Sequence, residues 1–348
     1  MRVIIKEVTE LRTSIIEIFE DFGLKELKGK NVFIKPNMLR IAQPDDCIIT
    51  DPALVRETTS YLLDCGANLI VGDNPIPQLV DEVEVAKRCG FFEASKGRFK
   101  NIGRYIKRIK INHKNLKEVY VSKEILECEI LLSLPKFKTH ELTGLSIAIK
   151  NQFGMVPGGL KPKLHYECFK PDDFYNLLIE IYKIRPPDLI IVDCLRVRDA
   201  KGKLYRPNRI IAGDNGFAID CVCSLIAGIA PEANPLLQIA LKRNLFDPKK
   251  IEVIGKLEII KGFATPISFP FRKFFIGLGN FLFSRLQNWR CPVIDVSNCN
   301  NCRSCENVCP KRAIRNKEID YKKCIKCYCC IEVCPNNAIN LKFRMPSS

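Results

Sequence analysis

Two features of membrane and secreted proteins are missing from this sequence of 348 residues. No run of 18 or more apolar residues occurs, so we expect no membrane-spanning helix. Residues 1–8 are typical of the start of a strand and not of a basic-then-apolar signal peptide. We therefore expect a cytoplasmic protein, in which the 18 cysteines are metal ligands or small buried side chains rather than disulfide partners.

Two phosphate-binding motifs are also missing, a complete Gly-x-Gly-x-x-Gly sequence and a Walker sequence. The chain is nevertheless basic, with a formal net charge of +16. Residues 291–348 hold 10 Lys and Arg against 5 Asp and Glu, so a charge of +11 belongs to residues 1–290. Such an excess favours an anionic partner. Nucleic acid is not the expected one, because the central basic segment (residues 134–165) has few aromatic residues for base stacking and no recognised nucleic-acid motif.

Strand-like and helix-like patterns alternate along residues 1–255. Apolar runs at residues 32–34, 68–71, 130–134 and 189–192 predict strands, and residues 52–65, 80–89, 145–153, 172–184 and 215–227 predict helices. This alternation is typical of βαβ units, so we predict an α/β fold with a mainly parallel sheet covered by helices on both faces. Ligands of such sheets bind beyond the carboxyl ends of the strands.

Eight cysteines near the C-terminus form two copies of one spacing, 25 positions apart. Each copy is Cys-x2-Cys-x2-Cys-x3-Cys-Pro, in which three cysteines hold one [4Fe–4S] cluster and the fourth serves the other cluster. The predicted ligands are Cys299, Cys302, Cys305 and Cys334 for the first cluster, and Cys324, Cys327, Cys330 and Cys309 for the second. Structural zinc sites require neither the x3-Cys-Pro ending nor the tandem copy, so zinc is not the expected metal. Cys329 falls at a non-ligand spacing, and we expect it to pack.

The cysteine spacing also divides the chain. Residues 291–342 resemble a bacterial-type two-[4Fe–4S] ferredoxin, so we predict a small α+β ferredoxin-like domain at residues 291–348. The basic α/β domain is expected at residues 1–260, with an aromatic-rich linker or interfacial helix at residues 261–290. Within this linker, residues 263–289 hold eight aromatic side chains and either pack between the domains or contact a membrane surface.

The central basic segment concentrates groups that bind anions and transfer protons. It holds two of the three histidines and a single carboxylate. Lys136, Lys138 and His140 alternate after a buried strand, so we expect all three to point to one side. Lys150 lies in an apolar helix, where a buried amine needs a partner or a function. The candidate catalytic residues are His140, His165 and Lys150, with the histidines available for proton transfer.

Polar residues at the predicted strand ends extend this set. Lys35 and Asn37 follow the strand at residues 32–34, and Asp73 follows the next strand along the chain. Asp220 lies in a helix of apolar residues, and we expect one of the central lysines as its partner. The predicted ligand-binding residues are Lys35, Asn37, Asp73, Lys136, Lys138, Asn151 and Asp220.

Short motifs follow one another in a fixed order through residues 30–230. They are Ile34-Lys35-Pro36-Asn37, Gly72-Asp73-Asn74-Pro75, the run at residues 134–140, Lys150-Asn151 with Phe153-Gly154, Pro157-Gly158-Gly159 with His165, and the helix that contains Asp220. In this order they resemble the domain-of-unknown-function family 362, many members of which end in Pro-Val-Ile-Asp and a two-cluster ferredoxin. The resemblance implies that the central lysines and histidines form a site, but it assigns no reaction. A more distant resemblance, to the N-terminal domain of nickel-pincer lactate racemase, concerns the fold alone.

These observations predict an iron–sulfur oxidoreductase. It would pass electrons, through two [4Fe–4S] clusters, to or from an anionic substrate or cofactor held by the α/β domain. Low-potential clusters with cysteine ligands suit reductive chemistry in an anaerobe. The alternatives are a non-enzymatic electron carrier or maturation factor that docks a redox partner protein, and an electron-transfer component that contacts a membrane through residues 263–289. The sequence leaves open whether a further organic cofactor is bound.

Overall fold

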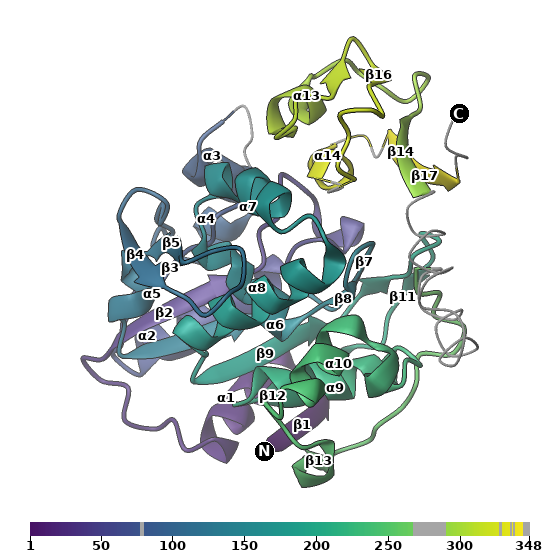
Figure 1. The fold of residues 1–348 in the computed structure, drawn as a ribbon. Coiled ribbons are helices and arrows are strands. Elements are labelled where there is room, and N and C mark those ends of the chain that lie inside the picture. Colours follow the sequence, from purple (N-terminus) through teal and green to yellow (C-terminus); the bar gives the residue numbers. More distant parts are fainter. Residues whose placement is uncertain (77–79, 267–289, 327–328, 335, 337, 344–348) are drawn as a thin grey trace.

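The structure is a computed structural model that describes residues 1–76, 80–266, 290–326, 329–334, 336 and 338–343. Most of them form a layered α/β body, and residues 290–343 form a smaller unit above it in the view of Figure 1. None of the described helices has the length and apolar character needed to cross a bilayer. Cys327 and residues 267–289 of the aromatic-rich segment lie outside the described residues.

Seven strands form the central sheet, in the order β13-β1-β12-β9-β6-β2-β3 (Figure 1). They are β1 (Arg2–Glu7), β2 (Asn31–Pro36), β3 (Asn68–Val71), β6 (Ile130–Leu134), β9 (Leu189–Cys194), β12 (Arg209–Gly213) and β13 (Glu252–Ile254). β9, β6, β2 and β3 pair in parallel, whereas β12 runs antiparallel to both of its neighbours. The prediction of an α/β fold with a mainly parallel sheet is confirmed, with one reversed strand that the sequence pattern did not predict.

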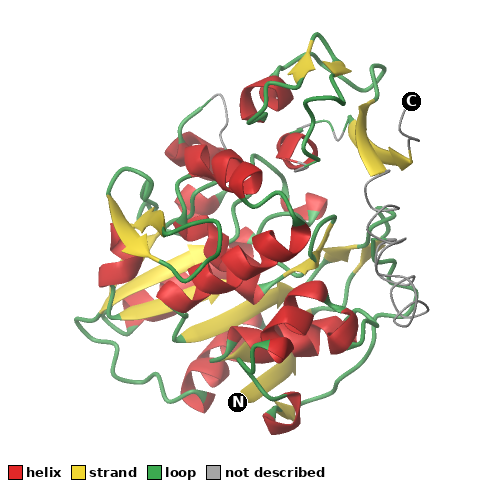
Figure 2. Cartoon of the chain, viewed as in Figure 1, coloured by secondary structure: helices red, strands yellow, loops and turns green. Residues whose placement is uncertain are grey.

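Helices cover both faces of the sheet, because successive side chains of its strands enter opposite cores (Figure 2). In β2, Val32 and Ile34 pack into the core with α1 and α2, whereas Phe33 packs into the other core with α8. The main helices are α1 (Leu11–Asp21) and α2 (Pro52–Asp64) on the first face, and α8 (Pro171–Ile184), α9 (Gly216–Ile226) and α10 (Pro235–Lys242) on the second.

The helix predicted at residues 145–153 is wrong in its first half. Gly144–Ser146 form strand β8, which pairs with β7 (Lys138–His140). Helix α6 (Ala148–Asn151) begins only after Ile147, whose backbone is not helical. A short apolar run fits a helix and a strand equally well, so the pairing with β7 decides between them. The helices predicted at residues 52–65 and 172–184 are confirmed as α2 and α8.

Smaller elements complete the α/β body. They are the helices α3 (Glu82–Arg88), α4 (Phe91–Ala94), α5 (Lys123–Glu127) and α7 (Lys161–Glu167), and two hairpins, β4 (Ile106–Lys110) with β5 (Glu118–Ser122) and β10 (Val197–Arg198) with β11 (Leu204–Tyr205).

The C-terminal unit repeats one pattern of strands and short helices. β14 (Arg290–Ile294) pairs with β17 (Ile339–Phe343), β15 (Ile314–Arg315) pairs with β16 (Glu318–Ile319), and the helices are α13 (Ser304–Val308) and α14 (Cys329–Val333). Described residues of the unit contact the α/β body. Ile76 packs with Val308 and Cys329, and Lys311 donates to the Tyr166 hydroxyl at 3.0 Å.

Candidate functional site

Four charged residues lie at the carboxyl ends of neighbouring parallel strands, where such sheets place their ligand sites. Lys35 belongs to the end of β2 and pairs with Asp73, just beyond β3, at 2.7 Å. Lys136 follows β6 and pairs with Asp193, in β9, at 2.8 Å. All four side chains are buried. The two ion pairs therefore form a buried layer at the carboxyl ends of these strands.

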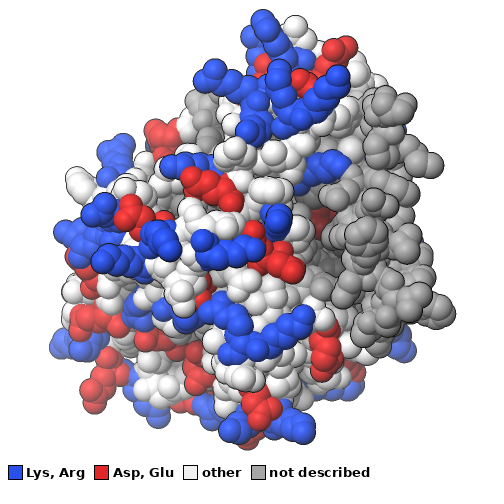
Figure 3. Space-filling model, viewed as in Figure 1, with Lys and Arg blue, Asp and Glu red and all other residues white. Residues whose placement is uncertain are grey.

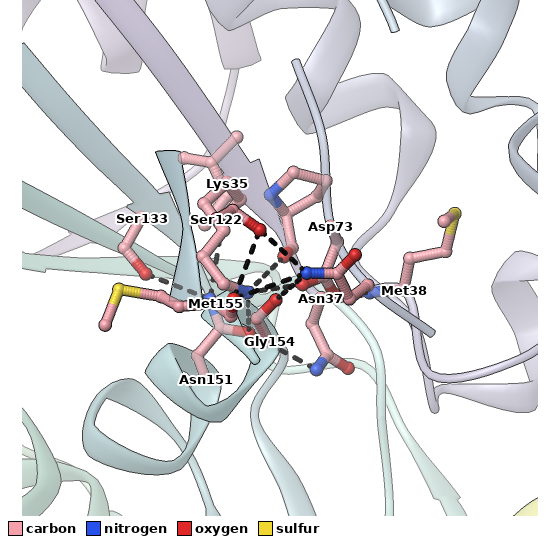
Figure 4. Close-up of polar contacts among 12 residues, drawn as sticks. Lys35, Asn37, Met38, Asp73, Ser122, Ser133, Asn151, Gly154 and Met155 are labelled. Atoms are coloured by element: carbon pink, nitrogen blue, oxygen red, sulfur yellow. Dashed lines mark hydrogen bonds and ion pairs between the residues drawn. The ribbon is translucent and has the colours of Figure 1, made fainter. Parts of the chain in front are cut away.

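The Lys35–Asp73 pair is further fixed by the backbone (Figure 4). Asp73 Oδ2 accepts the N–H of Met38 at 2.7 Å, and Lys35 Nζ donates to Asp73 Oδ1. Burial lowers the pKa of Lys35, and the charge of Asp73 opposes this shift. Loss of one partner of such a pair leaves an uncompensated buried charge, which typically costs about 3–5 kcal/mol.

Gly154 packs closely against this pair. A Cβ atom at residue 154 would overlap Asp73 Oδ1 and Lys35 Nζ, whereas a Cβ at Gly159 would meet nothing within 4 Å. We expect Gly154→Ala to lower the free energy of unfolding by about 1–3 kcal/mol or more, because buried groups must move. Urea unfolding of the full chain measures this loss. Gly159→Ala is the control, and an equal effect of the two substitutions would contradict the packing described.

Two amides, Asn151 and Asn37, lie beside the ion pair in Figure 4, and Asn37 leads on to a third lysine. Asn151 Nδ2 donates to Ser133 Oγ at 2.9 Å, and its Oδ1 accepts from Asn37 Nδ2 at 3.3 Å. Asn37 Oδ1 in turn accepts from Lys138 Nζ at 2.7 Å. The orientation of Lys138 is thus set by a chain of hydrogen bonds that begins in β6.

Above these groups lies a cavity of about 230 Å³ between the α/β body and α14, which we call the interdomain cavity. Its polar lining consists of Asn37, Arg40, Asp73, Asn74, Lys138, Thr139, His140, Glu141, Ser146, Lys150, Asn151, Lys161 and His165. Its apolar lining includes Met38, Leu39, Ile48, Ile76, Phe153 and, from α14, Cys329 and Ile331. Four cations thus face a space sized for a small molecule, with one wall from the C-terminal unit.

Seven of the ten catalytic and ligand-binding residues predicted from the sequence line the cavity, whereas Lys35, Lys136 and Asp220 do not. Lys136 is fully buried against Asp193 and does not line the cavity, so it does not share a side with Lys138 and His140. Strand β6 ends at Leu134, and only an isolated bridge between Lys136 and Asp193 precedes β7, so the alternation rule for one continuous strand does not apply to these residues. Sequence reasoning missed Arg40 and Asn74, because loop residues carry no periodic pattern.

His140 and Lys150 form the reactive pair of the cavity. His140 Nδ1 accepts the backbone N–H groups of Leu142 (3.1 Å) and Thr143 (3.3 Å), so its lone pair is used there. The neutral ring therefore carries its proton on Nε2, which contacts Lys150 Nζ. Nε2–H can donate to Lys150 only while that amine is neutral, and a protonated amine must turn away from the ring. The amine can therefore take up and release a proton beside the cavity.

His165 has different surroundings. Its ring stacks on Phe174 with centroids 4.2 Å apart and meets Phe153 edge-on at 5.8 Å. Lys161, from the same helix α7, contacts the carbonyl oxygen of Asn74 and lies over the Phe153 ring. His165 thus lines the cavity as part of an aromatic wall.

Asp220 does not pair with a lysine, so the partner predicted for it is wrong. Its Oδ1 accepts the backbone N–H of Ala148 at 2.8 Å, at the start of α6. Because α6 carries Lys150 and Asn151, Asp220 positions the cavity residues without lining the cavity. Burial raises the pKa of Asp220 to about 7.

This raised pKa predicts that the chain loses stability as the pH rises through the weakly acidic range. The unfolded chain releases the Asp220 proton near its usual pKa of 3.8, whereas the folded chain keeps it up to about 7. The contribution is therefore complete below pH 3.8 and lost as the pH passes the folded pKa, at about 1.4 kcal/mol per pH unit. Urea unfolding of wild type and Asp220→Asn from about pH 5 to about pH 8 measures this slope. An unchanged slope in the variant would contradict the assignment.

The C-terminal unit provides donors that fit iron–sulfur clusters. Cys299, Cys302, Cys305 and Cys334 line one small cavity, so three cysteines of the first copy meet the last cysteine of the second. Backbone N–H groups donate to two of the sulfurs, Ala313 to Cys309 and Ala338 to Cys334, both at 3.2 Å. Aliphatic side chains surround the cysteines. Thiolates in an apolar shell with N–H donors are the environment that such clusters use.

Cys329 packs against Ile76 and Val308, as expected for a cysteine at a non-ligand spacing. Arg40 brings a cation close to the cluster-binding unit. It is buried, and burial lowers its pKa, while Asp46 and the Cys334 thiolate oppose this shift. Arg40 thus lines the interdomain cavity and interacts electrostatically with a predicted cluster ligand. Within the described residues, no group of three or more His, Cys, Asp and Glu is placed to hold a single metal ion.

Fold and site together define an iron–sulfur protein with an α/β body and a cluster-binding unit capable of electron transfer. Residues 32–224 match the family model described as domain of unknown function DUF362, and residues 292–315 and 317–340 match the 4Fe-4S binding domain. The chain belongs to the DUF362 family.

Two known proteins are similar to this chain. Thylakoid-associated protein sll1697 of Synechocystis sp. is 27% identical over 241 residues, which are 66% of this chain and 73% of that protein. The lactate racemase apoprotein of Thermoanaerobacterium thermosaccharolyticum matches 64% of this chain with 15% identity and a TM-score of 0.43. This chain spans 57% of the length of that racemase.

Proposed function

We propose that this protein is an oxidoreductase that exchanges electrons with a small organic anion bound in the interdomain cavity. The observation that supports it is the composition of one wall, in which Cys329 and Ile331 of α14 face the cations of the α/β body. Cys330, a predicted ligand of the second cluster, stands between these two residues in the sequence. A molecule in the cavity would therefore lie next to a cluster.

The chemistry of the lining residues fits an anionic electron acceptor or donor. Bound clusters supply one-electron transfer. Arg40, Lys138, Lys150 and Lys161 would hold carboxylate or phosphate groups, and the apolar wall would hold the carbon skeleton. Reduction of an unsaturated acceptor would take two protons together with two electrons, which the two predicted clusters would supply. The His140–Lys150 pair would deliver a proton and regain it from solvent, and the reverse reaction would use the same groups.

The test uses the full chain purified without oxygen. Organic molecules that copurify are identified by mass spectrometry, and dithionite-reduced protein is then mixed with small carboxylates and phosphates. We expect at least one anion to reoxidise the clusters with saturable kinetics, followed by the visible absorbance of the clusters. Reoxidation by a redox protein, with no response to any small anion, would contradict the proposal and favour the electron-carrier alternative.

A further inference from the structure

The β4–β5 hairpin forms an exposed basic surface outside the interdomain cavity. Residues 104–123 contain seven Lys and Arg and one carboxylate, Glu118. Figure 3 shows Lys and Arg gathered at the edge of the molecule where Figure 1 places these two strands. Lys107 and Lys123 pair with Glu127, Arg108 pairs with Glu118, and Lys114 pairs with Asp173. The seven cations still outnumber these three carboxylates, so this edge carries a local positive field.

The hairpin has two faces of opposite character. On the inner face, Val119 and Val121 are buried, and Ile109 packs with them in the core. On the outer face, the register places Arg108 opposite Tyr120 and Lys110 opposite Glu118. The inner face anchors the hairpin rigidly to the body, so the outer face is presented in a fixed orientation.

Large apolar side chains are exposed among these cations. Tyr105 is 66% exposed, Ile106 is 43% exposed and Tyr120 is 39% exposed. No carboxylate of the described residues forms an ion pair with Arg104, Lys110 or Lys117. Charges alone would be sufficient to protect the open edge of β4 from aggregation. Exposed tyrosines and an isoleucine do not serve that purpose, because they favour association.

We propose that the outer face of the β4–β5 hairpin binds the surface of an anionic lipid membrane. Tyrosine rings favour the headgroup region, where the ring is buried and the hydroxyl stays hydrated. Lysine and arginine near an anionic leaflet contribute about 1 kcal/mol each. Ile106 adds an aliphatic group that can enter the acyl boundary. A single-stranded nucleic acid would use the cations and tyrosine rings, but it gives an aliphatic side chain no comparable partner.

The surface is also connected to the interdomain cavity. Ser122, at the end of β5, accepts from Asn74 Nδ2 at 3.0 Å and donates to the carbonyl oxygen of Met155 at 3.1 Å. Asn74 itself lines the cavity. Membrane binding through the hairpin would therefore hold the redox site at a fixed place relative to the lipid surface. The proposal does not depend on the chemistry of the cavity.

The test is flotation of the anaerobically purified full chain with lipid vesicles. The probes are vesicles of phosphatidylcholine alone and of phosphatidylcholine with phosphatidylglycerol. We expect binding to the anionic vesicles only. The triple variant Arg104→Gln, Lys110→Gln, Lys117→Gln should weaken it about 100-fold, since three charges are removed. Tyr105→Ser with Ile106→Ser should weaken binding at unchanged charge.

A matched triple variant controls for net charge. Lys25, Lys249 and Lys250 are exposed lysines outside the hairpin, and their replacement by Gln removes the same charge. This control should keep binding within about twofold of wild type. Circular dichroism and iron content show whether each variant folds. Equal binding of both triple variants, no binding of wild type to anionic vesicles, or binding of single-stranded RNA in place of vesicles would overturn the proposal.

Discussion

Replacement of Lys150 by alanine is expected to slow reoxidation of the reduced clusters by a cavity anion about 10²–10⁴-fold, the usual loss when a proton donor is removed. The structure supports this size of effect because Lys150 contacts His140 Nε2, while His140 Nδ1 is already occupied by two backbone N–H groups. Stopped-flow absorbance of dithionite-reduced protein measures the rate.

Lys163 provides the matched control for this substitution. It lies in the same basic segment, its side chain is 67% exposed, and it pairs with Glu167 outside the cavity. Lys163→Ala should change the rate by no more than about twofold. Equal rates for wild type, Lys150→Ala and Lys163→Ala would show that the pair of Lys150 and His140 takes no part in the reaction.

The number of clusters lost from a double cysteine variant should depend on which two cysteines are replaced. The small cavity joins Cys334 of the second copy to three cysteines of the first copy. In this crossed arrangement Cys299 and Cys334 serve one cluster, so the double variant Cys299→Ala, Cys334→Ala should lose half of the iron and keep one cluster signal. Cys299→Ala with Cys309→Ala should damage both clusters, because Cys309 serves the other one.

Iron and sulfide analysis with electron paramagnetic resonance of the reduced protein distinguishes the two double variants. If each copy of the motif held its own cluster, the outcomes would be exchanged. Single variants control for the general effect of each substitution, and circular dichroism shows that the α/β body remains folded.

Periodic features of the fold were predictable from the sequence, and contacts between distant segments were not. The apolar runs of β2 and β9 and the amphipathic pattern of α8 arise from local burial, which a sequence records directly. The reversed direction of β12 depends on pairing with β1, some 200 residues away in the chain, and leaves no local pattern.

The same distinction holds for the site. The cysteine spacing predicts the cluster ligands from a short stretch of sequence. The contacts of each lysine side chain depend instead on residues that are distant in the sequence. Lys136 forms a buried ion pair with Asp193. Lys138, two positions later, donates a hydrogen bond to Asn37 and lines the cavity. Asp220 is held by a backbone N–H that no side-chain pattern could indicate. Arg40 lies in a loop, and its place in the cavity lining has no local sequence pattern to predict it.

An anion in the interdomain cavity would lie next to a cluster. This central placement is tested most directly by the midpoint potentials of the clusters, measured by redox titration followed by electron paramagnetic resonance. The anion that binds the oxidised protein most tightly in a screen of dicarboxylates and phosphates is added at saturation. Because anion binding and cluster reduction are reciprocally linked, the bound negative charge should shift at least one potential downward, by about 59 mV for each tenfold preference for the oxidised state. Lys138→Ala should abolish both binding and shift. Tight binding that leaves both potentials unchanged would contradict a shared site.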